Sequence, residues 1–182
     1  VSIGTLEMLY GIDIDYYFRV NFSGFEKIID ALGGVTVNSD YDFSAGGYYF
    51  QKGENHVNGS QALAFARERK SFKEGDRQRG RNQMAVIKAV INKAMSPAIL
   101  SGYADIMESV AGSFETSMPY DLIAELVRDM LEKGGSWNIV SYSVNGSGDS
   151  RRPYSMSTNA YVMIPDQETV DTAIEKINQV MN

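Results

Sequence analysis

A short basic segment contains the residues of this sequence that are best suited to chemistry. Residues 66–83, ARERKSFKEGDRQRGRNQ, hold seven of the 17 basic residues, whereas the whole chain of 182 residues has a net charge of −6. Guanidinium groups bind phosphate oxygens two at a time because their planar N–H groups match that geometry. The segment therefore indicates a local anion site, and the acidic remainder argues against a general affinity for nucleic acid or anionic lipid.

The spacing of side chains in residues 76–95 predicts which of them face inward on a helix of about 3.6 residues per turn. The apolar residues that define the expected inward face are Val86, Ile87, Val90, Ile91 and Ala94. Polar residues that fall on the same face, one to three turns earlier, are Asp76, Arg79 and Gln83. Basic residues expected to point towards solvent are Arg77, Arg81 and Lys88.

An arginine on an inward face needs a paired anion, because burying an unpaired charge costs several kcal/mol. Asp76 is one turn from Arg79, and we expect Arg67 and Arg69, at the end of the preceding helix, to converge on the same place. One carboxylate cannot neutralise three guanidinium groups, so phosphate or pyrophosphate is the natural supplement. The amides at the helix start and the side chain of Gln83 add further donors. The alternative, a solvated charged surface, suits the remaining basic residues of the segment.

Composition sets broad limits on the protein. The length suits one domain, and the absence of cysteine together with a single histidine, His56, argues against disulfides and a zinc site. No apolar run approaches the ~20 residues of a membrane span. Asp40 and Asp42 form an isolated D-x-D that favours a turn over a cation site, and we expect His56 to be a structural hydrogen-bonding residue.

Periodicity and turn residues predict an α/β domain around a mixed central sheet flanked by helices. The expected helices are residues 2–11, 23–34, 59–69, 77–95, 98–114, 119–135 and 166–181. The expected strands are residues 15–22, 35–37, 137–144 and 160–165, with loops over 38–58 and 145–159. We further expect a capping box between Ser23 and Glu26, and Trp137 at the core or its edge.

Two blocks of the sequence resemble the LytR–CpsA–Psr family. HVNGSQALAFARERK followed by GDRQRGRNQMAVIKAV is similar to the central signature of that family, and IDIDYYFRVNFSGFEKIIDALGGVTV is similar to an upstream block. The closing AYVMIPDQETVDTAIEKI also resembles the end of the family domain. The resemblance implies a single extracytoplasmic domain over residues 1–182, which lacks the N-terminal portion of the family domain.

The resemblance also implies a function. Family members are membrane-anchored enzymes, mostly of Gram-positive bacteria, that move a glycan polymer of teichoic-acid or capsule type from a polyprenyl pyrophosphate carrier to peptidoglycan, forming a phosphodiester. Their phosphate-binding residues match Arg67, Arg69, Arg79 and Gln83 here, and their neighbouring acid matches Asp76. Asp76 is then the candidate catalytic base; the alternative is that it caps the helix and orients Arg79. The expected location is the extracytoplasmic face of the cell membrane.

The front of the family domain is absent from these residues. The resemblance places two aspartates that bind Mg²⁺ or a similar ion, and a membrane anchor, upstream of Val1, so no metal ligand is expected in this chain. An alternative is therefore a regulatory or structural module that binds polyprenyl phosphate without catalysis. A nucleic-acid-binding module is a second alternative. Such a module needs outward-pointing arginines interleaved with aromatic residues, whereas Phe72 is the only aromatic residue in residues 66–83.

Overall fold

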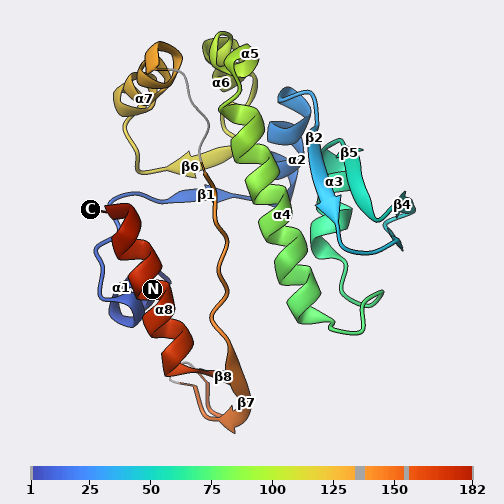
Figure 1. Ribbon diagram of the computed structural model, residues 1–182, viewed down its shortest axis with the longest axis vertical. Helices are drawn as coiled ribbons and strands as arrows, with labels where there is room; N and C mark the ends of the chain where they lie inside the picture. Colours follow the sequence, from blue (N-terminus) through green and yellow to red (C-terminus); the bar gives the residue numbers. More distant parts are fainter. Residues whose placement is uncertain (1, 134–137, 154–155, 182) are drawn as a thin grey trace. The chain divides into compact units, whose positions relative to one another are not determined.

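The computed structural model describes residues 2–133, 138–153 and 156–181, and it divides into two compact units. Unit 1 comprises residues 1–15 and 140–182, and unit 2 comprises residues 16–139 (Figure 1). Unit 1 contains α1 (Ser2–Tyr10), β7 (Gly146–Arg151), β8 (Ala160–Pro165) and α8 (Gln167–Met181). Unit 2 contains β1 (Phe18–Val20), α2 (Phe22–Ala31), β2 (Val35–Ser39), β3 (Phe43–Ala45), β4 (Tyr48–Phe50), β5 (Gly53–Val57), α3 (Gly59–Arg67), α4 (Asp76–Ala94), α5 (Pro97–Leu100), α6 (Tyr103–Ser109), β6 (Phe114–Thr116) and α7 (Tyr120–Lys133).

The α/β class is confirmed, and helices pack against sheets in unit 2. Within the described residues, every strand pairing is antiparallel and two-stranded, namely β1–β6, β2–β5, β3–β4 and β7–β8. The sheet structure of the described residues is therefore divided into four pairs. The strand, helix and strand expected over residues 15–37 all form, but β1 and β2 pair with different partners.

The core of unit 2 lies between the β2–β5 pair and the helices α2, α3 and α4 (Figure 1). Alternate residues of β2 are buried, with Val35 and Val37 each 1% exposed, as a strand with one covered face requires. Phe43, Phe50 and Phe65 pack their rings together, with centroids 4.9–5.4 Å apart. This aromatic cluster joins the β3–β4 hairpin to α3.

The loop expected over residues 38–58 is wrong, because this segment forms β3, β4 and β5. Gly46 and Gly47 both have positive φ, 57° and 83°, which lets a two-residue turn reverse the chain between β3 and β4. The segment is rich in Gly, Asn and Ser, which is typical of loops. Its composition therefore did not indicate a hairpin whose strands are only three residues long. The Gly-Gly pair between aromatic residues was the available signal.

Helix α2 begins earlier than expected. Asn21 is the cap, and its side chain accepts a hydrogen bond from the amide of Gly24 at 2.7 Å, so the predicted capping box between Ser23 and Glu26 is wrong. Asparagine and serine are both good caps, and the chain uses the one that precedes Phe22. The helix expected over residues 98–114 is also wrong in extent, since it divides into α5, α6 and the short strand β6.

Unit 1 is built on the β7–β8 hairpin and on α1 with α8. The strand expected over residues 137–144 is wrong for residues 138–144, which are neither helix nor strand, and Trp137 lies outside the described residues. The strand forms instead at Gly146–Arg151, inside the predicted polar loop. An added Cβ at Gly146 or Gly148 lies within 3 Å of Ile164 or Tyr161 on β8, so small residues permit this pairing.

Replacing glycine by alanine is expected to have opposite effects at two helical glycines of unit 2. A Cβ at Gly59 lies 2.3 Å from the carbonyl oxygen of Glu26 on α2, whereas a Cβ at Gly80 on α4 meets nothing within 4 Å. We expect Gly59→Ala to cost about 1–3 kcal/mol by forcing α2 and α3 apart. We expect Gly80→Ala to stabilise by about 0.5–1 kcal/mol through helix propensity. Urea unfolding midpoints measure both, and an unchanged midpoint for Gly59→Ala would contradict the observed packing.

Candidate functional site

Two helix ends carry the predicted site residues. Helix α3 starts at a capping box between Asn58 and Gln61 and ends at Arg67, after which Glu68 adopts an extended backbone with φ −66° and ψ 134°. Arg69 follows in the connecting loop. Helix α4 begins at Asp76, immediately after Gly75, whose φ of 52° turns the chain into the helix. The helices α3 and α4 pack against each other, so both ends belong to one unit.

The inward face of α4 differs from the predicted one. The buried residues of this helix are Gln78, Asn82 and Val86, whereas Gln83 and Asp76 are exposed and Ile87 is 46% exposed. The prediction that Asp76, Arg79 and Gln83 share the buried face is therefore wrong by about a quarter of a turn. The error arose because the apolar residue Ile87 was assigned to the core, although packing against α3 and β2 selects the stripe that starts with two amides. The other apolar predictions fit better, since Val86 is buried and Val90 and Ala94 pack against the core.

The predicted ion pair between Asp76 and Arg79 is confirmed. Arg79 Nη2 lies 2.7 Å from Asp76 Oδ1, one turn along α4. The side chain of Arg79 is 37% exposed and that of Asp76 is 67% exposed. A pair this exposed contributes only about 0.3–0.5 kcal/mol to stability.

The ring of Phe22 lies against Arg67, a contact that the sequence analysis did not predict. The guanidinium carbon of Arg67 lies 4.6 Å from the centre of the Phe22 ring, a cation–π distance. Phe22 is the first residue of α2 and is 60% exposed, so the ring covers one face of the guanidinium and leaves its N–H groups accessible. The two residues are 45 positions apart in the sequence, so no local pattern indicates the contact.

Glu68 holds the loop that follows α3. Burial raises the pKa of this carboxyl, but hydrogen bonds from Ser71, whose amide donates to Oε1 at 2.7 Å, together with backbone amides nearby, outweigh burial and lower the pKa overall. Glu68 is therefore a carboxylate at neutral pH. Glu68 lies between Arg67 and Arg69 in the sequence, and its carboxylate accepts its hydrogen bond from Ser71 in the loop.

The arrangement leaves several cationic groups available at one end of the α3–α4 pair. Arg67 and Arg69 are exposed and Arg79 is half-buried, while Gln83 lies one turn beyond Arg79 on α4. The structure brings Asp76 and Arg79 into contact and puts Arg67 against Phe22. The convergence of Arg67, Arg69, Arg79 and Gln83 on a single ligand remains a prediction.

The described residues do not fit a metal ion. No group of three or more His, Cys, Asp and Glu side chains in residues 2–133, 138–153 and 156–181 is arranged to hold one. Asp42 accepts hydrogen bonds from the amide of Lys52 at 2.8 Å and from the hydroxyl of Tyr49 at 3.2 Å, as expected for a turn.

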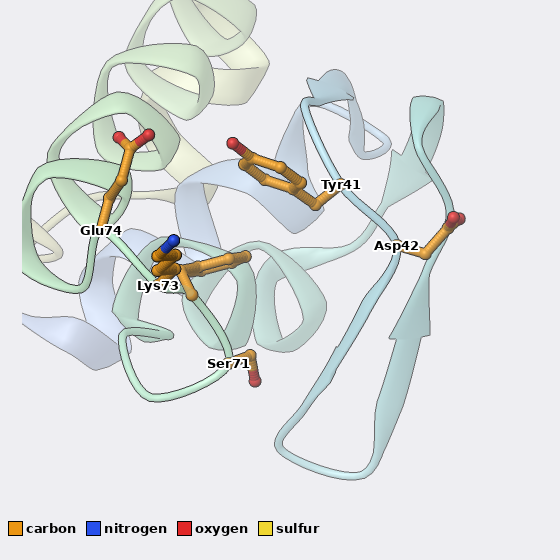
Figure 2. A pocket seen from close by; sticks show the side chains of 6 residues that line it. Tyr41, Asp42, Ser71, Lys73 and Glu74 are labelled. Atoms are coloured by element: carbon orange, nitrogen blue, oxygen red, sulfur yellow. The ribbon is translucent and has the colours of Figure 1, made fainter.

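A surface pocket of about 350 Å³ lies beside the start of α4 (Figure 2). Tyr41 and Asp42 line it from the segment after β2, and the α3–α4 loop completes it with Ser71, Phe72, Lys73 and Glu74. Both of its carboxylates already have protein partners, because Asp42 accepts the two hydrogen bonds described above and Glu74 pairs with Arg81. The pocket contains none of the predicted site residues.

Two further predictions concern His56 and the membrane. Nδ1 of His56 lies 3.5 Å from the hydroxyl of Thr36 across the β2–β5 pair, which suits the expected structural role. Among the described residues, none of the helices combines the length and apolar character that crossing a membrane requires.

The chain belongs to the LytR_cpsA_psr family, whose family model matches residues 1–179. Among its relatives, the polyisoprenyl-teichoic acid–peptidoglycan teichoic acid transferase TagU of Bacillus mycoides (strain KBAB4) is 40% identical over 129 residues, which is 71% of this chain and 42% of that protein. The TagU of Bacillus subtilis (strain 168) is 34% identical over 148 residues, or 81% of this chain and 48% of that protein. The chain thus spans about half the length of the curated relatives it matches.

The fold is also found in solved structures. The crystal structure of B. subtilis TagV superposes with a TM-score of 0.77 and 29% identity, covering 98% of this chain and 68% of that one. Family membership confirms the resemblance drawn from the ARERK and GDRQRGRNQ motifs.

Proposed function

We propose that the protein to which this chain belongs is a transferase that moves a teichoic-acid-type glycopolymer from a polyprenyl pyrophosphate carrier to peptidoglycan. The observation that carries the proposal is the α3–α4 end, where Arg67, Arg69 and Arg79 are accessible and a single carboxylate, Asp76, pairs with Arg79. Family membership and the names of the TagU relatives support the same activity.

The residues take roles that phosphoryl transfer requires. Arg67, Arg69 and Arg79 bind the diphosphate oxygens, and Gln83 donates a neutral hydrogen bond to them. Asp76 accepts the proton of the peptidoglycan hydroxyl as that oxygen attacks phosphorus. A phosphodiester forms, the bond to the carrier phosphate breaks, and polyprenyl phosphate leaves. The site fits positioning and charge neutralisation, which dominate this class of reaction.

Location, cation and domain organisation complete the proposal. Peptidoglycan as acceptor implies work on the outer face of the cell membrane, and the proposal includes a membrane anchor and a Mg²⁺-type ion. Residues 1–182 act as part of a single extracytoplasmic domain. Binding of the carrier without catalysis is the remaining alternative.

A transfer assay separates these possibilities. We expect the full-length protein to move labelled glycopolymer from its polyprenyl pyrophosphate carrier to peptidoglycan, and the double variant Arg67→Ala/Arg69→Ala to lose transfer by about 10² or more, since each charge-assisted contact contributes about 1.5–3 kcal/mol. Carrier binding without transfer by the unmodified protein would establish the alternative. A Lys70→Ala variant is the control, because Lys70 is an exposed neighbour outside the proposed contacts.

A further inference from the structure

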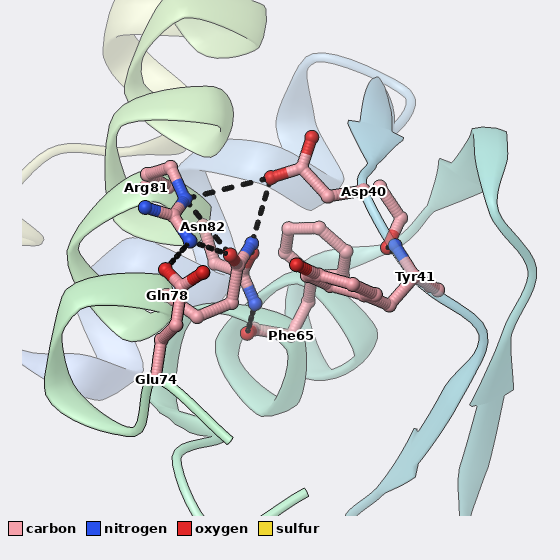
Figure 3. Close-up of polar contacts among 8 residues, drawn as sticks. Asp40, Tyr41, Phe65, Glu74, Gln78, Arg81 and Asn82 are labelled. Carbon is pink, nitrogen blue, oxygen red and sulfur yellow. Dashed lines mark hydrogen bonds and ion pairs between the residues drawn. The ribbon is translucent and has the colours of Figure 1, made fainter. Parts of the chain in front are cut away.

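A network of buried amides joins the two arginine-bearing segments. Gln78 and Asn82 are 1% and 2% exposed and lie one turn apart on the inward face of α4 (Figure 3). Gln78 Nε2 donates to Asn82 Oδ1 at 3.0 Å and to Asp40 Oδ2 at 2.8 Å. Asp40 follows β2 directly, so one side chain ties α4 to the end of the central strand pair.

Asn82 continues the network to α3. Its Nδ2 donates to the carbonyl oxygen of Phe65 at 3.2 Å, and Phe65 is 0% exposed. The carbonyls in the last turn of a helix have no donor within the helix, and the chain leaves α3 two residues later. The amide of Asn82 thus satisfies a buried carbonyl at the point where α3 presents Arg67.

The opposite end of the network is charged. Arg81 Nε donates to Gln78 Oε1 at 2.8 Å, and its Nη2 pairs with Glu74 at the end of the α3–α4 loop. The hydrogen bond to Glu74 is the main cause that raises the pKa of the Arg81 guanidinium, which stays charged. Both amide hydrogens and the oxygen of Gln78 are therefore in use, and no buried side-chain N or O atom of the described residues lacks a partner.

The residues of the network lie close in the sequence to the proposed phosphate-binding residues. Phe65 precedes Arg67 by two positions, and Gln78 lies between Asp76 and Arg79. An apolar contact between two helices permits small slides and rotations, whereas paired amides fix one register. A shift of about 1 Å in a binding group is enough to cost 10²-fold in rate, so the register of α3 against α4 matters to the arginines.

We propose that Gln78 and Asn82 are positioning residues, which lock the register of α3 against α4 and so set the spacing between Arg67 and Arg69 on one side and Arg79 on the other. Neither residue contacts the ligand. The inference rests on the proposed phosphate site for its functional consequence, but the locking itself does not depend on that function.

The test uses the full-length protein, inorganic pyrophosphate as the probe, and a control variant that also destabilises the protein. We expect Gln78→Leu and Asn82→Leu to weaken pyrophosphate binding in titration calorimetry by at least about tenfold. Val86→Ala removes buried contacts one turn further along the same face of α4, and we expect it to leave affinity within about twofold although it also destabilises the protein. All variants are compared at a temperature well below their unfolding midpoints.

Hydrogen exchange gives a readout that is independent of ligand binding. The backbone amides of residues 66–70 should exchange faster in Gln78→Leu and Asn82→Leu than in the unmodified protein, and at an unchanged rate in Val86→Ala. Unchanged exchange and affinity in both leucine variants would overturn the inference. If the unmodified protein fails to bind pyrophosphate, the proposed function falls, while faster exchange in the leucine variants still supports the lock.

A milder pair of variants serves if the leucine variants do not fold. Arg81→Gln removes the fork that holds Gln78 Oε1, and Arg77→Gln removes the same charge from an exposed position without a contact in the network. We expect Arg81→Gln to weaken pyrophosphate binding about threefold more than Arg77→Gln, the equivalent of one net hydrogen bond. Equal losses in the two variants would mean that only charge was removed and would overturn the inference.

Discussion

Arg79→Ala is expected to remove most of the thermal stabilisation that polyprenyl pyrophosphate gives to the full-length protein. A ligand that binds only the folded state at 100 times its Kd stabilises it by about 2.7 kcal/mol. For a protein of about 150–250 residues this corresponds to a rise in Tm of roughly 5–10 °C. Arg79 is the proposed phosphate ligand on α4, and Asp76 already holds it in place without burying it. Its loss removes a charge-assisted contact and most of the shift.

Arg77→Ala is the matched control for this measurement. Arg77 stands on the same helix, two positions earlier, and is exposed outside the proposed contacts. Its removal lowers the local positive charge by the same amount, so a general electrostatic effect would appear in both variants. A full shift in Arg79→Ala would remove Arg79 from the site. No shift in the unmodified protein would count against the phosphate site as a whole.

Asp76→Asn is expected to lower glycopolymer transfer by about 10² or more while lowering carrier affinity by less. Asparagine keeps the shape and a hydrogen-bond acceptor for Arg79 but cannot take a proton. The pair it modifies is exposed, with Asp76 at 67% and Arg79 at 37%, so the loss of stability should stay below about 0.5 kcal/mol. Loss of stability is therefore too small to mask the difference between the two roles considered for Asp76, a catalytic base or a strut that positions Arg79.

Affinity and transfer are measured on the same preparation. Near-normal transfer would eliminate Asp76 as the base, and equal losses of affinity and transfer would identify it as a strut. Asp121→Asn is the control, because Asp121 is an exposed acid in the first turn of α7, a position like that of Asp76 in α4. It should leave both quantities unchanged.

Local sequence features predicted a large part of the fold. The helices α1, α3, α4, α7 and α8 and the strands β2 and β8 form within a few residues of their predicted bounds, because amphipathic spacing, capping residues and glycine stops act over a few neighbouring positions. The short strands β3, β4 and β5 escaped prediction. The three-residue strands β3 and β4 contain too few residues to establish an alternating pattern, and partners such as the Phe43–Phe50–Phe65 ring cluster stabilise them. Strand β5 has five residues, but its sequence, GENHV, is mostly polar and loop-like in composition.

The sequence by itself determined the motif that identifies the family and the local pairing of Asp76 with Arg79, because both depend on spacing along one segment. The tertiary structure alone decided which face of α4 is buried, since that face is chosen by α3 and β2 and not by the helix itself. It also decided that Phe22 covers Arg67 and that Gln78 and Asn82 join Asp40 to Phe65. These contacts link residues 17–45 positions apart, and only the folded chain brings them within hydrogen-bond or cation–π distance.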